Sequence, residues 1–198
     1  RFIKFMIRIG ILGDIGSGKS HIAKQFGFPV FNADQEVSDL YKKNKKIFLK
    51  LNKVLPNHIH SFPINKDEIL NAILNNNNNL KKIIKIVHKE IRKKMIFFLK
   101  RNKNKKIIIL DIPLLLENKI SRKRDVLIFV ESKKSEILKR LKKRKNFNLK
   151  LFKKFKKIQL SLDYKKKKSH FIIKNDFSNK TIKKSIKDIL NRIWQWKK

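Results

Sequence analysis

The sequence contains no cysteine among its 198 residues. This absence excludes a disulfide scaffold, a thiolate zinc site and a cysteine nucleophile, and it fits a reducing compartment, so we expect a cytoplasmic protein. No run approaches the roughly 20 apolar residues that a membrane-spanning helix needs, and no membrane partner is expected. Arg8 interrupts the apolar opening, and a glycine-rich loop follows in place of a cleavage site, so the opening predicts a strand rather than a signal peptide.

Acidic residues are scarce: 15 aspartates and glutamates stand against 53 lysines and arginines, for a formal net charge of +38. Such an excess is typical of proteins with a polyanionic partner. Here the basic residues are dispersed along the chain, and they accompany abundant isoleucine, asparagine and phenylalanine, which all have AT-rich codons. Compositional drift is therefore enough to explain the charge without selection for binding, and the sequence leaves open whether the charge is functional. No specific nucleic-acid partner is expected, although nonspecific binding to RNA at low salt would follow from the charge alone.

The length suggests one domain, and a hydrophobic content of 41% is enough to bury a core. Continuous apolar runs predict buried strands over residues 5–12, Val30–Phe31, Ile107–Leu110, Val126–Val130 and Phe171–Ile173. Apolar spacings of three and four predict one long helix over 80–98. Helices are also expected over about 18–26, 35–50, 67–75, 133–145 and 182–193. This alternation predicts an α/β fold, with a parallel sheet flanked by helices on both faces.

In two segments, the apolar residues show no clear helical or strand spacing. Residues 147–168 form a basic insertion that is either irregular or helical. The run Asn75–Asn79 is of low complexity, and we expect it to be a solvated loop between helices.

Glycine is also scarce: the chain has five, and none lies after residue 27. Four of them nevertheless fall within residues 10–18, where they allow the backbone to approach a ligand closely. Residues Gly13–Ser20 fit the pattern G-x-x-x-x-G-K-[ST] between a predicted strand and a predicted helix, which is the context of a phosphate-binding loop. In such a loop, successive backbone N–H groups and a helix N-terminus surround an anion.

The loop therefore supplies the candidate ATP-binding residues. Lys19 would reach the β- and γ-phosphates, and the Ser20 hydroxyl would be a ligand of Mg²⁺. The carboxylate of Asp14 should repel a phosphate unless its side chain points away, and the sequence gives no account of it. The full candidate set is Gly13, Asp14, Ile15, Gly16, Ser17, Gly18, Lys19, Ser20 and His21.

Several classes of phosphate-loop protein are excluded. A GTPase needs a D-x-x-G switch, which is impossible without glycine beyond residue 27, and no N-K-x-D sequence is present. A large motor or helicase would not fit into 198 residues. Small-molecule kinases remain.

Polar residues follow the predicted strands, where ligands bind in open parallel sheets. They include Asn32 and Asp34, Asp111, Glu131 with Ser132, and Lys174 with Asn175. Acids at these positions suit two tasks, which are accepting a proton from an acceptor hydroxyl and holding Mg²⁺ directly or through water.

Taken together, these residues resemble the dephospho-CoA kinase family over nearly the whole chain. Residues 10–20 are similar to that family's G-L-T-G-G-I-G-S-G-K-S, residues 31–34 to I-D-A-D, residues 87–92 to L-H-P-x-x-R, and residues 111–117 to D-I-P-L-L-F-E. Arg140, Arg144, Gln159 and Asn175 match two lid arginines, a downstream glutamine and an asparagine after the last strand. Asp14 stands where the family has glycine, and Asn32 where it has aspartate.

The resemblance implies a three-layer kinase fold in which ATP phosphorylates the ribose 3′-hydroxyl of dephospho-CoA, the last step of coenzyme A synthesis. It implies one domain over 1–198, with a core (1–35, 101–139 and 169–198), a helical CoA-binding region (36–100) and a lid (140–168). It also implies ATP and Mg²⁺ as cofactors and dephospho-CoA as the small-molecule partner. We expect a monomer or a weak homo-oligomer.

Roles follow from the same resemblance. Asp34 is the expected general base, with Lys19 and Arg140 as the other catalytic residues, and Arg144 and Asn175 join the ATP site. Ser20 and Asp111 are the expected metal ligands. Substrate binding is assigned to Asp34, His88, Arg92, Leu114, Leu115 and Glu117.

Simpler interpretations stand beside these roles. Asp34 is also suited to capping a helix, Asp111 to capping a turn, and Leu114–Leu116 to packing a core. The alternatives for the whole chain are another small-molecule or nucleoside kinase, and a basic nucleic-acid-binding protein without enzymatic activity.

Overall fold

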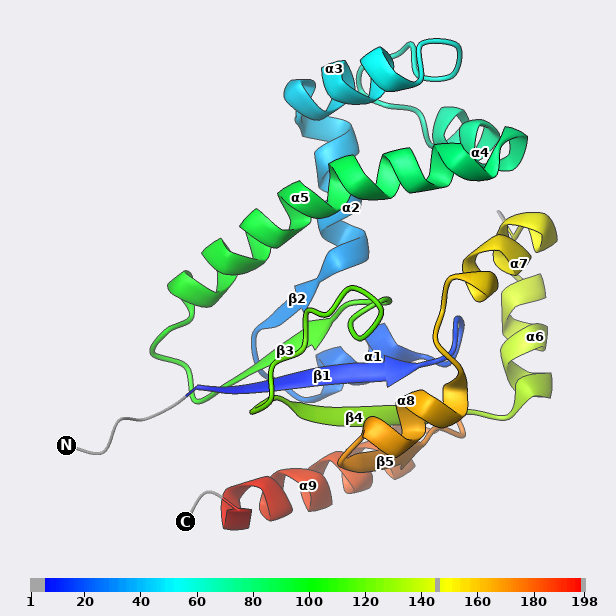
Figure 1. Cartoon of the computed structure of the whole chain (residues 1–198). Coiled ribbons are helices and arrows are strands. Elements are labelled where there is room, and N and C mark those ends of the chain that lie inside the picture. Colours follow the sequence, from blue (N-terminus) through cyan, green and yellow to red (C-terminus); the bar gives the residue numbers. More distant parts are fainter. Residues whose placement is uncertain (1–5, 145–146, 197–198) are drawn as a thin grey trace. The chain divides into compact units, whose positions relative to one another are not determined.

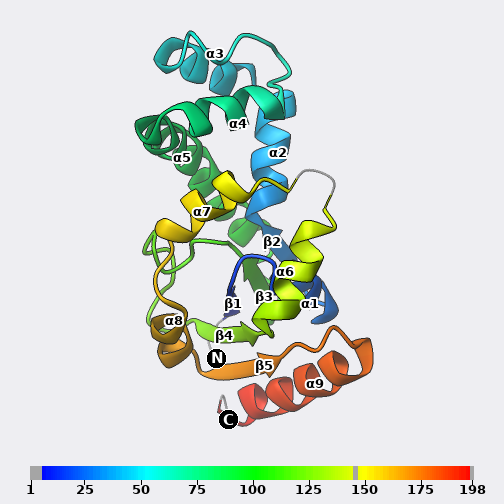
Figure 2. The same ribbon diagram turned by 90° about the vertical axis from the view of Figure 1, so that its right-hand side faces the viewer.

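The computed structural model describes residues 6–144 and 147–196. The chain divides into two compact units, shown in Figures 1 and 2. Of the described residues, the sheet unit takes in 6–32, 102–144, 147 and 156–196, and the helical unit takes in Ala33–Arg101 and Asn148–Phe155.

The sheet unit contains, within its described residues, one sheet of five parallel strands in the order β2-β3-β1-β4-β5. The strands are β1 (Ile7–Gly13), β2 (Val30–Asn32), β3 (Ile107–Asp111), β4 (Val126–Glu131) and β5 (Phe171–Lys174). The register pairs Asn32 with Asp111 and Gly13 with Val130, so the carboxyl ends of these strands lie at one edge. The predicted parallel α/β sheet is confirmed.

Helices cover both faces of this sheet (Figure 1). Alternate residues of β1, such as Ile9 and Ile11, pack with helices α1 (Lys19–Gln25) and α9 (Asn179–Trp196) in one core cluster. On the other face, Gly10 leaves room for the side chains of Leu115 and Leu127. Helix α8 (Leu162–Lys168) contacts β1 and β4, and α6 (Lys134–Lys142) follows β4.

The helical unit is built around the long helix α5 (Asn77–Arg101). Helices α2 (Ala33–Lys43), α3 (Lys45–Val54) and α4 (Lys66–Asn75) each contact α5. Most of α7 (Leu149–Lys157) also belongs to this unit, because the Lys154 ammonium donates to the backbone oxygens of Ile73 at 2.6 Å and Leu74 at 3.2 Å.

Two predictions for the helical unit are wrong. The predicted helix 35–50 is two helices, because Asn44 has extended backbone and its side chain accepts a hydrogen bond from Ile47 N as the N-cap of α3. The asparagine run is not a loop: α4 ends at Asn75 and α5 begins at Asn77. Asn79 is buried, and its amide donates to the Ala72 oxygen at 2.9 Å, so a tertiary contact supports helix in this segment.

In the part of the chain that the structure describes, no helix combines the length and the apolar character that crossing a membrane requires.

A buried ion pair lies inside the sheet unit. Arg8, in β1, contacts Asp125 at 3.0 Å, and the two side chains are 6% and 2% exposed. Asp125 also accepts from Arg122 N, while Arg8 donates to the Ile120 oxygen. Burial lowers the pKa of the Arg8 guanidinium and raises the pKa of the Asp125 carboxyl, so each charge depends on the other.

Replacing Asp125 with alanine is expected to lower the free energy of unfolding by about 3–5 kcal/mol, because Arg8 would remain as a buried charge without a counter-ion. Urea unfolding measures this loss. Glu90→Ala is the matched control, since its pairs with the exposed lysines Lys50 and Lys93 are each worth at most about 1 kcal/mol. Combining Asp125→Leu with Arg8→Met should recover most of the stability. A loss for Asp125→Ala no larger than that of the control would contradict the prediction.

Candidate functional site

The loop Gly13–Ser20 connects β1 to α1, and its glycines are required by the backbone. Gly18 has φ 90°, and a Cβ there would lie 2.5 Å from the Asn175 side chain. Gly13 has φ 147°, and a Cβ there would lie 2.7 Å from the Val130 oxygen. Side chains at both positions would therefore distort the loop, which explains why a glycine-poor sequence keeps glycine here.

The peptide of Ser17 is fixed from outside the loop. Its carbonyl oxygen accepts hydrogen bonds from the Asn175 amide at 2.8 Å and from the Ser132 hydroxyl at 3.0 Å. Asn175 follows β5, is 5% exposed, and is itself held because its side-chain oxygen accepts from Phe177 N. Side chains that follow β4 and β5 thus fix the orientation of the Ser17 peptide.

Lys19 lies over the loop. Its ammonium group donates to the backbone oxygen of Asp14 at 2.6 Å and to that of Gly13 at 3.3 Å. This positive charge and the loop amides lie together at the N-terminus of α1, an arrangement that suits an anion with several oxygens.

Asp14 places a carboxylate in the same loop. The residue is 7% exposed, and its Oδ1 atom accepts from Ile15 N at 2.6 Å. The ammonium group of Lys156 contacts the same oxygen, also at 2.6 Å. Lys156 belongs to the basic insertion, whose charge the sequence attributes to composition, so its partnership with Asp14 was not predicted.

Acidic and hydroxyl groups meet at the ends of β2 and β3. Asp111 is 3% exposed, and burial raises the pKa of its carboxyl group. A hydrogen bond from the Ser20 side chain, the charge of Lys19 and a hydrogen bond from Asn32 act in the opposite direction. The two predicted metal ligands, Ser20 and Asp111, are therefore brought together next to the phosphate loop.

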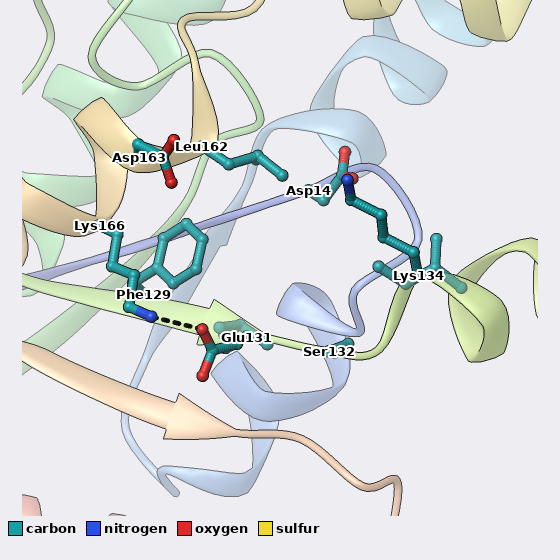
Figure 3. A pocket seen from close by; sticks show the side chains of 10 residues that line it. Asp14, Phe129, Glu131, Ser132, Lys134, Leu162, Asp163 and Lys166 are labelled. Atoms are coloured by element: carbon teal, nitrogen blue, oxygen red, sulfur yellow. Dashed lines mark hydrogen bonds and ion pairs between the residues drawn. The ribbon is translucent and has the colours of Figure 1, made fainter.

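A cavity of about 190 Å³ opens beside this loop at the carboxyl end of β4 (Figure 3). Glu131 and Lys166 form an ion pair of 2.6 Å at its border. Asp14 contributes to the wall from the loop, and Lys134 extends into the same region from α6. The cavity combines an apolar floor from Phe129 with charges of both signs.

Three predicted substrate-binding residues follow β3. Leu115 is 1% exposed and packs in the core, which is one of the two roles expected of it. Leu114 is half-buried, and its carbonyl accepts from the Asn118 side chain. Glu117 pairs with the buried Lys165 at 2.7 Å and accepts from Leu160 N, so in this structure it anchors the start of α8.

The predicted lid arginines lie on and after α6. Arg140 is exposed, and its guanidinium lies 3.8 Å from the centre of the Phe177 ring. Phe177 lies beside Gly18, since its ring would be 3.4 Å from a Cβ built there. Arg144 is exposed. Sequence reasoning missed several residues whose side chains contact predicted site residues, among them Phe177, Lys156, Lys165 and Asn179.

The remaining predicted residues are spread over both units. His21, in the sheet unit, is exposed, and its ring contacts the Asn179 side chain at 3.0 Å. Asp34, in the first turn of α2, is exposed. His88 and Arg92 lie one turn apart on α5, and burial, followed by the charge of Arg92, lowers the pKa of His88.

Known proteins resemble this chain in both sequence and fold. A family model described as "Dephospho-CoA kinase" matches residues 7–181 of this chain. A dephospho-CoA kinase of Wolbachia sp. subsp. Brugia malayi is 36% identical over 127 residues, which are 62% of this chain and 65% of that protein. The match therefore covers slightly less than two thirds of this relative's length.

Two solved structures share the fold. A Thermus thermophilus protein called TT1252 has a TM-score of 0.77 at 23% identity, with 94% of this chain and 97% of that chain covered. A dephospho-CoA kinase from Campylobacter jejuni has a TM-score of 0.62 at 24% identity, with coverage of 94% and 96%. At these identities, the likeness shows a common architecture.

Proposed function

Since the chain belongs to the dephospho-CoA kinase family, we propose that it transfers the γ-phosphoryl group of ATP to the ribose 3′-hydroxyl of dephospho-CoA and so produces coenzyme A. The observation that carries the proposal is the phosphate loop itself: Asn175 holds it at Ser17, it carries the Lys19 ammonium, and the side chain of its last residue, Ser20, is hydrogen-bonded to Asp111.

The loop performs the electrostatic part of the reaction. Phosphoryl transfer spreads negative charge over the oxygens of the transferred group, and prearranged donors stabilise that charge without reorganising. The amides of the loop and the Lys19 ammonium are such donors. Arg140 adds a second positive charge that is exposed on α6 and stacked on Phe177 beside Gly18. We assign Arg140 to the transferring phosphoryl group.

Magnesium fits the residues that are present. The described residues contain no cluster of three or more His, Cys, Asp or Glu side chains for a metal. Mg²⁺ is usually held by one or two protein oxygens together with substrate phosphates, however, and the Ser20 hydroxyl and the buried Asp111 carboxyl provide two. A bound cation would also compensate the Asp111 charge that burial disfavours. When bound, Mg²⁺ neutralises charge on the β- and γ-phosphates.

The acceptor side of the proposal rests on the family pattern. We assign proton acceptance from the 3′-hydroxyl to Asp34, and contacts with dephospho-CoA to His88 and Arg92 of α5. Substrate contacts by Leu114, Leu115 and Glu117 stay predictions, as do the functional names of the three segments, the monomeric or weakly oligomeric state and the cytoplasmic location.

The deciding experiment mixes the chain with Mg-ATP and dephospho-CoA and follows products by mass spectrometry. We expect the acceptor mass to increase by one phosphoryl group, with a product indistinguishable from coenzyme A. Parallel reactions contain nucleosides and other small alcohols, and one contains ATP alone to measure hydrolysis. Consumption of another acceptor with no consumption of dephospho-CoA would contradict the proposal and favour a different small-molecule kinase.

The two side-chain hydrogen bonds to the Ser17 carbonyl give a further prediction. Asn175→Ala removes the stronger donor to the Ser17 carbonyl, so we expect Mg-ATP affinity to fall at least about tenfold through misplacement of the loop. The free energy of unfolding should fall by about 1–3 kcal/mol. Calorimetric titration and urea unfolding measure the two effects. Asn191→Ala, which removes an exposed asparagine of α9, is the control. Unchanged affinity in Asn175→Ala would show that Ser132 alone suffices.

A further inference from the structure

The phosphate loop of this chain carries a charge that works against its proposed ligand. Asp14 is buried among the loop amides, where a carboxylate repels phosphate. The dephospho-CoA kinase sequence that this loop resembles has glycine at this position, so the Asp14 carboxylate is a departure from that pattern.

The Asp14 carboxylate also accepts a hydrogen bond from a backbone amide that the loop would use to bind phosphate. Ile15 N donates to Asp14 Oδ1 at 2.6 Å, so this amide is engaged by the chain's own anion. A phosphate that approaches the loop therefore meets an amide already in use and a negative charge beside it. The Asp14 carboxylate therefore competes with a phosphate for the Ile15 amide.

Lys156 supplies the compensation. Its ammonium group contacts the same Oδ1 atom at 2.6 Å, although the two residues are 142 positions apart in sequence. The Lys156 side chain is 35% exposed, whereas that of Asp14 is 11% exposed, so the lysine approaches from the solvent side. A lysine is a compact charge on a flexible stem, and it can exchange a carboxylate for a phosphate without a change of backbone.

The second lysine of the site meets the same residue. Lys19 donates to the Asp14 backbone oxygen at 2.6 Å, so two ammonium groups converge on one loop residue from different parts of the sequence. A phosphate bound by the loop would therefore lie within reach of both ammonium groups.

We infer that Lys156 compensates, within the phosphate loop, the carboxylate that Asp14 introduces, and that this compensation allows the loop to bind the phosphates of ATP. The inference rests on the proposed function, because it concerns the same nucleotide site. It assigns a role to one lysine of the basic segment 147–168. Compositional drift is enough to explain the other basic residues of that segment.

A double-mutant cycle on the full chain tests this inference, with Mg-ATP affinity measured by calorimetry at physiological ionic strength. The variants are Lys156→Ala, Asp14→Asn and their combination. Asparagine keeps the shape of Asp14 and an oxygen for Ile15 N but removes the charge. Lys157→Ala, which changes the exposed next residue, is the matched control, and urea unfolding of every variant checks that folding is intact.

We expect Lys156→Ala to weaken Mg-ATP binding by about tenfold or more, because an uncompensated carboxylate then faces the phosphates. In the Asp14→Asn background, the same substitution should cost less than about threefold. Asp14→Asn alone should bind Mg-ATP more tightly than the unmodified chain. Lys157→Ala should stay within about twofold of the unmodified chain.

Other results overturn the inference. A Lys156→Ala variant that binds Mg-ATP as the Lys157→Ala control does, or losses of equal size in both backgrounds, would show that Lys156 does not compensate Asp14. These titrations contain no dephospho-CoA, so a chain that shows the expected cycle but does not phosphorylate dephospho-CoA refutes only the proposed function. A chain that phosphorylates dephospho-CoA but lacks the cycle refutes only this inference. An unmodified chain that does not bind Mg-ATP overturns both.

Discussion

Replacing Lys19 with methionine is expected to lower turnover by about 10²–10³-fold, and to weaken Mg-ATP binding at the same time. Methionine keeps most of the length of the stem but removes the charge and the three donors. The loss corresponds to about 3–4 kcal/mol of transition-state stabilisation, at 1.36 kcal/mol for each factor of ten. Both binding and chemistry should suffer, because the ammonium group meets phosphates in the ground state and gains strength as charge develops.

The structure adds a reason for the effect on binding. The Lys19 ammonium donates to the oxygens of Gly13 and Asp14, and this contact ties the start of α1 to the first two residues of the loop. Lys19→Met removes this contact as well as the charge. Steady-state kinetics with dephospho-CoA and calorimetric titration with Mg-ATP measure the two effects separately.

Lys183→Ala, which changes an exposed lysine on α9, controls for the general loss of one charge from a chain of net charge +38. Its turnover and affinity should stay within about twofold of the unmodified chain. A Lys19→Met variant with turnover like that of this control would remove Lys19 from the mechanism, and with it the assignment of the loop to the reacting phosphates.

The core and the phosphate loop were predictable because their signals are local. Ile107–Leu110 and Val126–Val130 are uninterrupted apolar runs, and strands buried on both faces leave that pattern. The loop was identified by its glycines and by Lys19, all within eight residues of sequence. Strand order was not predictable in this way: β3 lies between β1 and β2, although four helices separate β2 from β3 in the chain.

The asparagine run shows how tertiary contacts override local propensity. Asparagine is a weak helix former, so a run of it indicates a loop. In the structure, the Asn79 amide is paired with the Ala72 oxygen and buried, so the backbone of α5 can begin at Asn77. The sequence of the asparagine run does not indicate this hydrogen bond to Ala72.

The support around the loop depends on contacts between distant residues. Asn175 and Ser17 are 158 positions apart, and Lys156 and Asp14 are 142 apart. The sequence marked Asn175 as a strand-end residue and Asp14 as an unexplained charge, but only the fold identifies what each one contacts. One of these partners, Lys156, lies in a segment with many other lysines, so the sequence alone does not indicate which lysine contacts Asp14.

The position of Asp34 allows two roles. It is the second residue of α2, directly beyond β2, and the last residue of that strand, Asn32, donates to Asp111. An acid in the first turn of a helix is favoured by the helix dipole by about 0.3–1 kcal/mol, which would explain Asp34 without any chemistry. Glu36 lies in the same turn and has the same sign of charge, so it is the matched control for this interpretation.

Asp34→Asn is expected to lower turnover by about 10²–10⁴-fold, because general-base catalysis of proton removal from the acceptor hydroxyl contributes that much. Mg-ATP affinity should change by less than about twofold, since the assigned partner of Asp34 is the alcohol rather than the nucleotide. Glu36→Gln should leave both quantities within about twofold of the unmodified chain. Single-turnover kinetics with dephospho-CoA separate the chemical step from product release. Equal and small effects of the two substitutions would assign Asp34 to the helix terminus, and the base would then have to be sought elsewhere.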